Sequence, residues 1–210
     1  MNLNILLMEA FSMEHYYTEN PNTPHSLEKI SYTIFDIQLE FITDTGVFSK
    51  KQVDFGSNVL IKNLPPLSGE ILDLGCGYGP IGISIAKLNP EANITMVDIN
   101  TRAVELAQEN IKLNNITNAI AIQSDGFNAI ADNIYDAIVT NPPIRAGKKI
   151  IYDLFEKSIE HLRTGGVFYA VIQKKQGAKS AMEKLQSIYG NCEAIEKKGG
   201  YWVLKCTKRQ

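Results

Sequence analysis

The stretch EILDLGCGYGPIGISIAKLN, residues 70–89, combines three local patterns that decide the fold. EILDL is a short apolar run typical of a buried strand, and PIGISIAKL repeats its apolar residues at helical spacing. Four glycines lie around the junction, where they permit unusual backbone angles and let a ligand approach the main chain. These glycines are Gly75, Gly77, Gly79 and Gly82. The stretch therefore predicts a strand, a turn and a helix, the usual ligand cradle of an α/β sheet.

The rest of the chain continues the alternation of strands and helices. Further strands are predicted at 93–99, 119–123, 135–141, 166–173, 192–197 and 201–207, and helices at 101–115, around 150–163, and between the strands at 166–173 and 192–197. The last two strands flank a Gly-Gly turn and should form a hairpin. The pattern predicts an α/β, Rossmann-like, mostly parallel seven-stranded sheet with helices on both faces and a C-terminal antiparallel hairpin.

The N-terminal part has a different character. Residues 31–49 alternate apolar and polar side chains before and after a Thr-Gly turn, which predicts a small β-rich preface. Residues 1–13 are expected to form a disordered extension, and 14–210 a single domain. Within that domain, 14–66 hold the preface and a first helix, and 67–210 hold the ligand-binding core.

Composition excludes several classes of protein. Three cysteines without CxxC spacing and three scattered histidines argue against a disulfide framework and against a metal site. No basic flank precedes the apolar residues near the start, and no apolar run reaches membrane-spanning length. A cytoplasmic protein without membrane contact is expected.

Charge is distributed unevenly along the chain. Residues 145–210 carry 14 Lys and Arg against six Asp and Glu, a net charge of +8, whereas residues 1–144 carry 7 against 17, a net charge of −10. The asymmetry indicates a polyanionic partner reached by the C-terminal third. Ordinary solvated helix faces would give the same counts, so charge alone leaves both interpretations open.

Two carboxylates near the glycines bear on the ligand. Asp98 follows Gly79 by 19 residues at a strand end, where an acid accepts hydrogen bonds from ribose hydroxyls. Gly77 to Gly82 also spells GxGxxG, so a dinucleotide fits the glycines equally well. Asp73, however, would repel a pyrophosphate and could pair with an ammonium group. This favours S-adenosylmethionine, which carries an ammonium and a sulfonium and no phosphate.

The stretch TNPP, residues 140–143, supplies the chemistry. An aromatic exocyclic amine is a poor nucleophile because its lone pair is delocalised, and two acceptors for its N–H groups would localise that lone pair. The carboxamide of Asn141 and the carbonyl of Pro142 are the predicted acceptors, held in place before the substrate arrives by Pro142 and Pro143. Alone, such a sequence would be an ordinary strand-terminating turn.

LDLGCGYGPIG, VDIN, SDGF and TNPP, in this order, resemble the motifs of class I S-adenosylmethionine-dependent methyltransferases. Together with GVFSKKQVDFGSNVLI at 46–61 they resemble the small-subunit ribosomal RNA guanine-N2 methyltransferase group, in particular its short single-domain bacterial members. The resemblance implies a methionine end held by Asp73, Gly75, Gly77 and Gly79, a ribose held by Asp98, and an adenine amino group held by Asp125. Cys76, Ile99, Gly126 and Asn141 complete the predicted cofactor site.

Two departures from this group affect the substrate end. Ile144 stands where many amino-methylating relatives have an aromatic residue that stacks on the base, so stacking is expected from Phe48, Tyr201 or Trp202, or is replaced by the apolar wall of Ile144. Arg145, Lys148 and Lys149 follow and are expected to hold phosphates. Some relatives also carry a second methyltransferase-like domain that helps to bind RNA, and none is expected here.

The expected function is methyl transfer from S-adenosylmethionine to an exocyclic amine in RNA, in particular guanine N2 of 16S rRNA. Methylation of a protein glutamine or a DNA adenine follows the same Asn-Pro-Pro logic, and a non-catalytic RNA-binding or ribosome-assembly factor is an alternative of another class. The sequence leaves the oligomeric state open.

Overall fold

The computed structural model describes residues 26–45, 47 and 51–209, except for the side chain of Arg145. The extension predicted at residues 1–13 lies outside this range. Seven strands form the main sheet, in the order β5-β4-β3-β6-β7-β9-β8. They are β3 (Gly69–Leu74), β4 (Ala92–Asp98), β5 (Ala119–Gln123), β6 (Tyr135–Thr140), β7 (Leu162–Gln173), β8 (Glu193–Lys198) and β9 (Tyr201–Thr207).

Strand directions agree with the prediction. β3 to β7 run parallel to one another, and β9 runs antiparallel to both β7 and β8. The C-terminal hairpin is therefore the antiparallel part of an otherwise parallel sheet, which confirms the Rossmann-like architecture.

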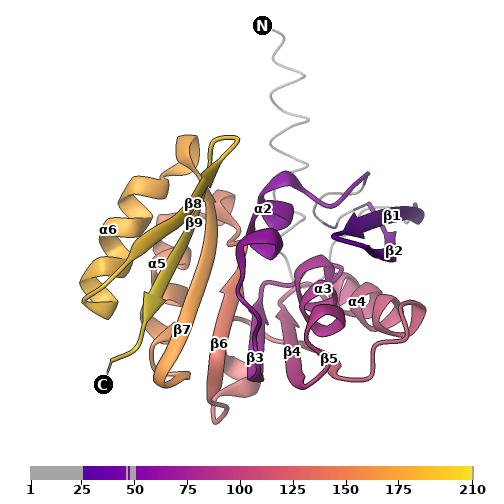
Figure 1. Cartoon of the computed structure of the whole chain (residues 1–210), viewed down its shortest axis with the longest axis horizontal. Helices are drawn as coiled ribbons and strands as arrows, with labels where there is room; N and C mark the ends of the chain where they lie inside the picture. Colours follow the sequence, from indigo (N-terminus) through magenta and orange to yellow (C-terminus); the bar gives the residue numbers. More distant parts are fainter. Residues whose placement is uncertain (1–25, 46, 48–50, 210) are drawn as a thin grey trace, which may run out of the picture.

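Helices cover both faces of this sheet (Figure 1). One face carries α2 (Phe55–Asn63), α3 (Pro80–Leu88) and α4 (Thr101–Leu113), and the other carries α5 (Lys148–Ser158) and α6 (Ala178–Tyr189). Successive strand residues point to opposite faces, so each face has its own apolar core. In β7, Tyr169 and Val171 pack with the first group of helices, whereas Phe168 and Ile172 pack with the second.

The N-terminal preface is a separate two-stranded sheet of β1 (Glu28–Ile34) and β2 (Ile37–Thr43). The alternating pattern of 31–49 suggested extended structure up to the Thr-Gly turn, but the chain reverses earlier, at Phe35 and Asp36. Phe35 has a φ of 50°, a left-handed conformation that a non-glycine side chain rarely adopts. No glycine marks this reversal, and the sequence pattern therefore missed it.

Two asparagines of α4 attach the hairpin to the main domain. Asn110 accepts from the N–H of Ile42 at 2.7 Å and donates to its carbonyl at 2.9 Å. One helical turn later, Asn114 makes the same pair of bonds with Glu40, at 3.0 and 2.7 Å. The outer edge of β2 is thereby paired by side-chain amides instead of by another strand.

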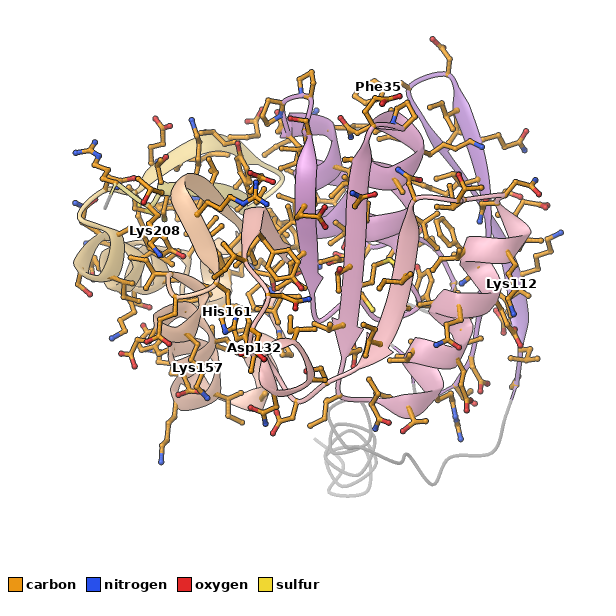
Figure 2. All side chains as sticks on the ribbon, turned by 90° about the horizontal axis from the view of Figure 1, so that it is seen from below. Phe35, Lys112, Asp132, Lys157, His161 and Lys208 are labelled. Atoms are coloured by element: carbon orange, nitrogen blue, oxygen red, sulfur yellow. The ribbon has the colours of Figure 1, made fainter. Side chains whose placement is uncertain are left out.

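The two edges of the parallel sheet differ. Asp132, His161 and Lys208, labelled in Figure 2, lie near the edge where β6 and β7 begin. Here His161 Nδ1 lies 3.0 Å from the Asn133 carbonyl, and Lys208 donates to the Leu162 carbonyl at 2.8 Å. The opposite edge, where the parallel strands end, holds the glycine-rich and Asn-Pro-Pro turns. No helix in the described part of the chain is long and apolar enough to span a membrane.

Candidate active site

A cavity of about 680 Å³ opens at the carboxyl ends of β3, β4, β6 and β7, a size suited to a nucleotide-sized ligand. It extends from the glycine-rich turn, past the ends of β4 and β5, to the Asn-Pro-Pro turn and the start of α2. The predicted residues that line it are Gly75, Cys76, Gly77, Asp98, Ile99, Asp125, Gly126, Asn141, Pro142, Pro143 and Ile144.

The glycines of the turn have different tasks. Gly75 and Gly77 have φ values of 76° and 57°, and a Cβ built on either would meet nothing within 4 Å. Both therefore leave room for a ligand against the backbone. Gly79, predicted to contact the cofactor, does not line the cavity. It is the N-cap of α3 with a φ of 94°, and a Cβ there would lie 2.9 Å from the side chain of Ile83.

Asp73, also predicted to contact the cofactor, does not line the cavity either. The side chain is fully buried below the turn, where Oδ2 accepts from the N–H of Gly82 at 2.8 Å. Oδ1 has no hydrogen-bond partner among the described residues. Burial raises the pKa of Asp73 to about 7, against an ordinary value of 3.8. In this structure the carboxyl group joins the end of β3 to α3 and supports the turn from below.

Asp98 occupies the position predicted for a ribose-binding acid. Oδ2 accepts from the N–H of Gly77 at 2.8 Å, and Oδ1 accepts from the N–H of Asn100 at 2.9 Å. Burial raises the pKa of Asp98, although the backbone donors at Asn100 and Gly77 oppose the shift. Each carboxylate oxygen can accept more than one hydrogen bond, so both retain capacity for a vicinal diol.

The charge of the residues that line the cavity decides between a dinucleotide and S-adenosylmethionine, both of which fit the glycine spacing. Asp54, Asp98 and Asp125 line the cavity, and the described lining residues include no Lys, Arg or His. A pyrophosphate would meet three carboxylates without a counter-charge, whereas a sulfonium and an ammonium would be stabilised. Tyr78 adds a buried hydroxyl that has no partner within the described residues. The donor and acceptor set fits S-adenosylmethionine.

Cys76 lines the cavity but is unsuited to nucleophilic chemistry. The thiol is buried, and its burial raises the pKa well above the ordinary value. A thiol is inert where the thiolate is disfavoured.

The Asn-Pro-Pro turn is tied directly to the glycine-rich turn. β3 and β6 are neighbours, and the Thr140 hydroxyl donates to the Leu74 carbonyl at 2.8 Å. Pro143 has φ −72° and ψ 74°, the centre of an inverse γ-turn, and the Pro142 carbonyl accepts from the N–H of Ile144 at 2.8 Å. A carbonyl has two lone pairs, so Pro142 retains one for a substrate.

The side chain of Asn141 is held from across the cavity. Its Nδ2 group donates to Asp54 Oδ2 at 3.1 Å and to Ser57 Oγ at 3.0 Å. Asp54 is the N-cap of α2 and Ser57 lies in its first turn. These contacts join residues more than 80 positions apart in the sequence.

The far end of the cavity has one aromatic wall. Tyr201 lines it, and Gly56 lets its ring lie against the first turn of α2, because a Cβ on Gly56 would stand 2.8 Å from Tyr201 Cε1. Trp202, its alternative, packs with the core on the other face of the sheet, where its ring lies 4.1 Å from Lys197 Nζ. Phe48, a third candidate, lies outside the described residues.

Two of the three predicted phosphate-binding residues lie outside the cavity. Lys148 and Lys149 are exposed in the first turn of α5, and neither lines the main cavity. Lys148 borders a small hollow next to it, shared with Ile144 and Gln176. The side chain of Arg145 is not described.

Sequence reasoning missed several of the described lining residues at the substrate end. Among them are Asp54, Ser57, Val171, Gln173 and Gln176. An Asp before a helix can be identified as an N-cap from sequence, but nothing local connects Asp54 to Asn141. The two glutamines could be predicted, because Gln173 ends β7 and Gln176 follows it, and residues at the carboxyl ends of parallel strands meet at one edge of the sheet.

Comparisons with known proteins agree with this geometry. Residues 38–205 match the methyltransferase small domain family. Uncharacterized protein YbxB of Bacillus subtilis is 48% identical over 198 residues, covering 93% of this chain and 98% of that protein. Ribosomal RNA small subunit methyltransferase C of Vibrio cholerae is 34% identical over 170 residues, which are 78% of this chain and 48% of that protein.

One solved structure is close in both fold and sequence. The 16S rRNA N2 G1207 methyltransferase of T. thermophilus, in complex with AdoMet and guanosine, superposes with a TM-score of 0.80 at 28% identity. The match covers 90% of this chain and 52% of that one, so this chain spans about half the length of the ribosomal RNA methyltransferases it matches. On these matches and on the site geometry, the chain belongs to the methyltransferase small domain family and is an S-adenosylmethionine-dependent methyltransferase.

Proposed function

We propose that the protein methylates an exocyclic amine of a nucleobase in RNA, and that this amine is guanine N2 of 16S rRNA. The observation that carries the proposal is the Asn141 amide, whose NH₂ group is bound by Asp54 and Ser57 so that its oxygen is left for an N–H donor. The Pro142 carbonyl supplies a second acceptor on the same turn. Two acceptors match the two N–H groups of an aromatic amine.

The residues of the chain bind and orient, and the methyl group comes from the sulfonium of the cofactor. Asn141 and Pro142 accept hydrogen bonds from the amine, which turns its lone pair out of the ring plane and toward the methyl carbon. The nitrogen would gain the methyl group as the carbon–sulfur bond breaks and the sulfonium becomes a neutral thioether, and one proton of the amine would pass to solvent. Ile144 and Tyr201 form apolar and aromatic walls for a base.

RNA as the partner is supported by charge outside the cavity. Lys148 and Lys149 lie at the N-terminus of α5, where the helix dipole disfavours cations. A phosphate bound there would be stabilised both by the lysines and by the helix end. The similarity to proteins named for 16S rRNA methylation points to the same class of acceptor.

The experiment is methyl transfer from labelled S-adenosylmethionine to 16S rRNA, and in parallel to assembled small subunits, both from a strain that lacks this protein. Digestion to nucleosides should give labelled N2-methylguanosine, and Asn141→Ala protein should form it about 10²–10³-fold more slowly. In parallel assays with DNA and with protein, label in N6-methyladenosine or in a glutamine would replace the proposed methyl acceptor. RNA binding without any transfer would favour a non-catalytic assembly factor.

A further inference from the structure

The Asn141 side chain is part of a closed hydrogen-bond triangle with the first turn of α2. Asn141 Nδ2 donates to Asp54 Oδ2 at 3.1 Å and to Ser57 Oγ at 3.0 Å, and the Ser57 hydroxyl itself donates to Asp54 Oδ2. Ser57 is buried, and both α2 residues border the cavity. All three side chains therefore restrain one another beside the position expected for the substrate amine.

The triangle fixes the direction in which the amide points. A carboxylate can only accept hydrogen bonds, and the hydroxyl proton of Ser57 is already given to Asp54, so its oxygen accepts from Asn141. Both partners of the Asn141 amide are acceptors, which requires its NH₂ group to face α2. Its Oδ1 has no hydrogen-bond partner within the described part of the chain, and it is the polar atom left for a ligand.

We propose that Asp54 and Ser57 are positioning residues that hold Asn141 with its acceptor oxygen toward the substrate. This inference rests on the proposed function only in taking the methylated atom to be a nitrogen that carries hydrogen. It adds a selection rule to the site. A methyl-accepting group that presents only lone pairs, such as a carboxylate or an unprotonated ring nitrogen, would face the oxygen of the fixed Asn141 amide and be repelled.

Asp54 has a second role that a test must separate from the first. As the N-cap of α2 it accepts from the N–H of Gly56 at 2.8 Å and from that of Ser57. An Asp54→Ala variant would lose the cap together with the triangle. Asn caps a helix about as well as Asp, so Asp54→Asn keeps α2 and replaces only the oxygen that faces Asn141 and Ser57.

The Asp54→Asn variant should reverse the amide of Asn141. With its oxygen capping α2, the new amide presents an NH₂ group, and Asn141 turns its own oxygen to meet it and its NH₂ into the cavity. A donor then faces the substrate amine, and kcat should fall about 10–100-fold while the Kd for S-adenosylmethionine changes less than about threefold. Ser57→Ala removes one of the two acceptors and should give a smaller loss.

An exchange of the two side chains supplies the rescue. Asn141→Asp alone sets a second carboxylate against Asp54 and should be inactive. In the double variant Asp54→Asn with Asn141→Asp, the carboxylate accepts from the new amide and still presents an oxygen to the substrate. Its kcat should exceed that of Asp54→Asn by about tenfold or more, a coupling expected only between residues in contact. Asp136→Asn, at the opposite edge of the sheet, is the matched loss of one carboxylate and should leave kcat unchanged.

A spectroscopic measurement tests the triangle without any assumption about which group receives the methyl. In ¹⁵N-labelled protein the side-chain NH₂ resonances of Asn141, identified by their loss in Asn141→Ala, should move in Ser57→Ala and in Asp54→Asn. Resonances that stay in place in both variants, or a double variant no faster than Asp54→Asn, would overturn the triangle. Resonances that move while 16S rRNA receives no methyl group would leave the triangle standing and reject the proposed function.

Discussion

The glycine-rich turn after β3 and the Asn-Pro-Pro turn after β6 end neighbouring strands, yet they are built from opposite kinds of residue. The first uses Gly75 and Gly77 at positive φ, and no side chain stands between backbone and cavity. The second uses two prolines, which lock φ and remove backbone donors, so it presents carbonyl and amide oxygens in fixed positions. In the proposed reaction, the first turn gives space for the cofactor and the second gives stiff hydrogen-bond acceptors for the substrate.

The largest effect is expected on the proline side. Asn141→Ala removes an acceptor that acts mainly in the transition state, so kcat should fall about 10²–10³-fold. The Kd for S-adenosylmethionine, measured by calorimetry, should stay within about threefold because the glycine-rich turn is intact. If cofactor affinity fell as far as kcat did, the division of labour between the two turns would be wrong.

The matching change on the glycine side is Gly77→Ala. Its Cβ would stand in the cavity, and affinity for S-adenosylmethionine should fall about 10–100-fold, measured by calorimetry. The left-handed conformation also costs about 1–2 kcal/mol of stability. Gly165→Ala separates the two effects, because Gly165 has a φ of 82° and open space around it but lies outside the cavity. That variant should lose stability and keep its affinity.

The carboxyl group of Asp73, below the glycine-rich turn, should make the stability of the fold depend on pH. A carboxyl group whose pKa is higher in the folded than in the unfolded protein stabilises the fold below the unfolded pKa, and this contribution is lost as pH rises toward the folded pKa. The pKa of Asp73 is raised from 3.8 to about 7, so cofactor-free protein should lose about 2–3 kcal/mol between about pH 5 and about pH 8 through this group. Asp73→Asn should flatten the dependence in urea unfolding. An unchanged slope would show that the carboxyl group is ionised in the folded protein.

A substitution of Tyr201 tests whether its ring forms the wall against which the substrate base stacks. Tyr201→Leu removes the ring that lines the cavity and should raise KM for RNA about fivefold to tenfold, the lower range for loss of one base stack. KM for the cofactor should not change. Trp202→Leu is the control, because Trp202 packs on the other face of the sheet. Equal effects of both variants on RNA would argue for a general loss of structure.

The smallest effect concerns the lysines that follow the proline turn. If Lys148 and Lys149 each hold a phosphate, their double alanine variant should reduce the salt slope of single-stranded RNA binding by about 1.4 units. The control is the double variant Lys112→Ala with Lys157→Ala, at two positions labelled in Figure 2. It removes the same charge and should leave the slope unchanged. An equal reduction by both pairs would assign the slope to overall charge.

The order of elements and both turns could be predicted from the sequence because each depends on local patterns. Alternating apolar runs gave seven strands, and the glycine and proline spacing located the turns. The roles of Asp73 and Gly79 could not be read in the same way. Motif spacing places both residues at the junction of strand and turn. That the Asp73 carboxylate accepts from Gly82, and that Gly79 lies against the side chain of Ile83, depends on how α3 packs there.

The residues around Asn141 were beyond local patterns for a different reason. Asp54 and Ser57 reach Asn141 only after α2 has been placed over the end of the sheet, where Tyr201 packs closely against Gly56. Tyr201 was one of three aromatic candidates, and its position in β9 directs it to the cavity while Trp202 points to the other face. Such contacts depend on the tertiary fold.

The asparagine pair on α4 also determines how the N-terminal hairpin comes apart. The amides of Glu40 and Ile42 donate to side chains of α4, so their hydrogens can exchange with solvent only when β2 separates from that helix. Asn110 donates in addition to the Tyr78 carbonyl at 2.9 Å, within the glycine-rich turn. One side chain, that of Asn110, therefore joins hairpin, helix and turn, and we expect exchange at Glu40 and Ile42 to respond to the stability of the glycine-rich turn.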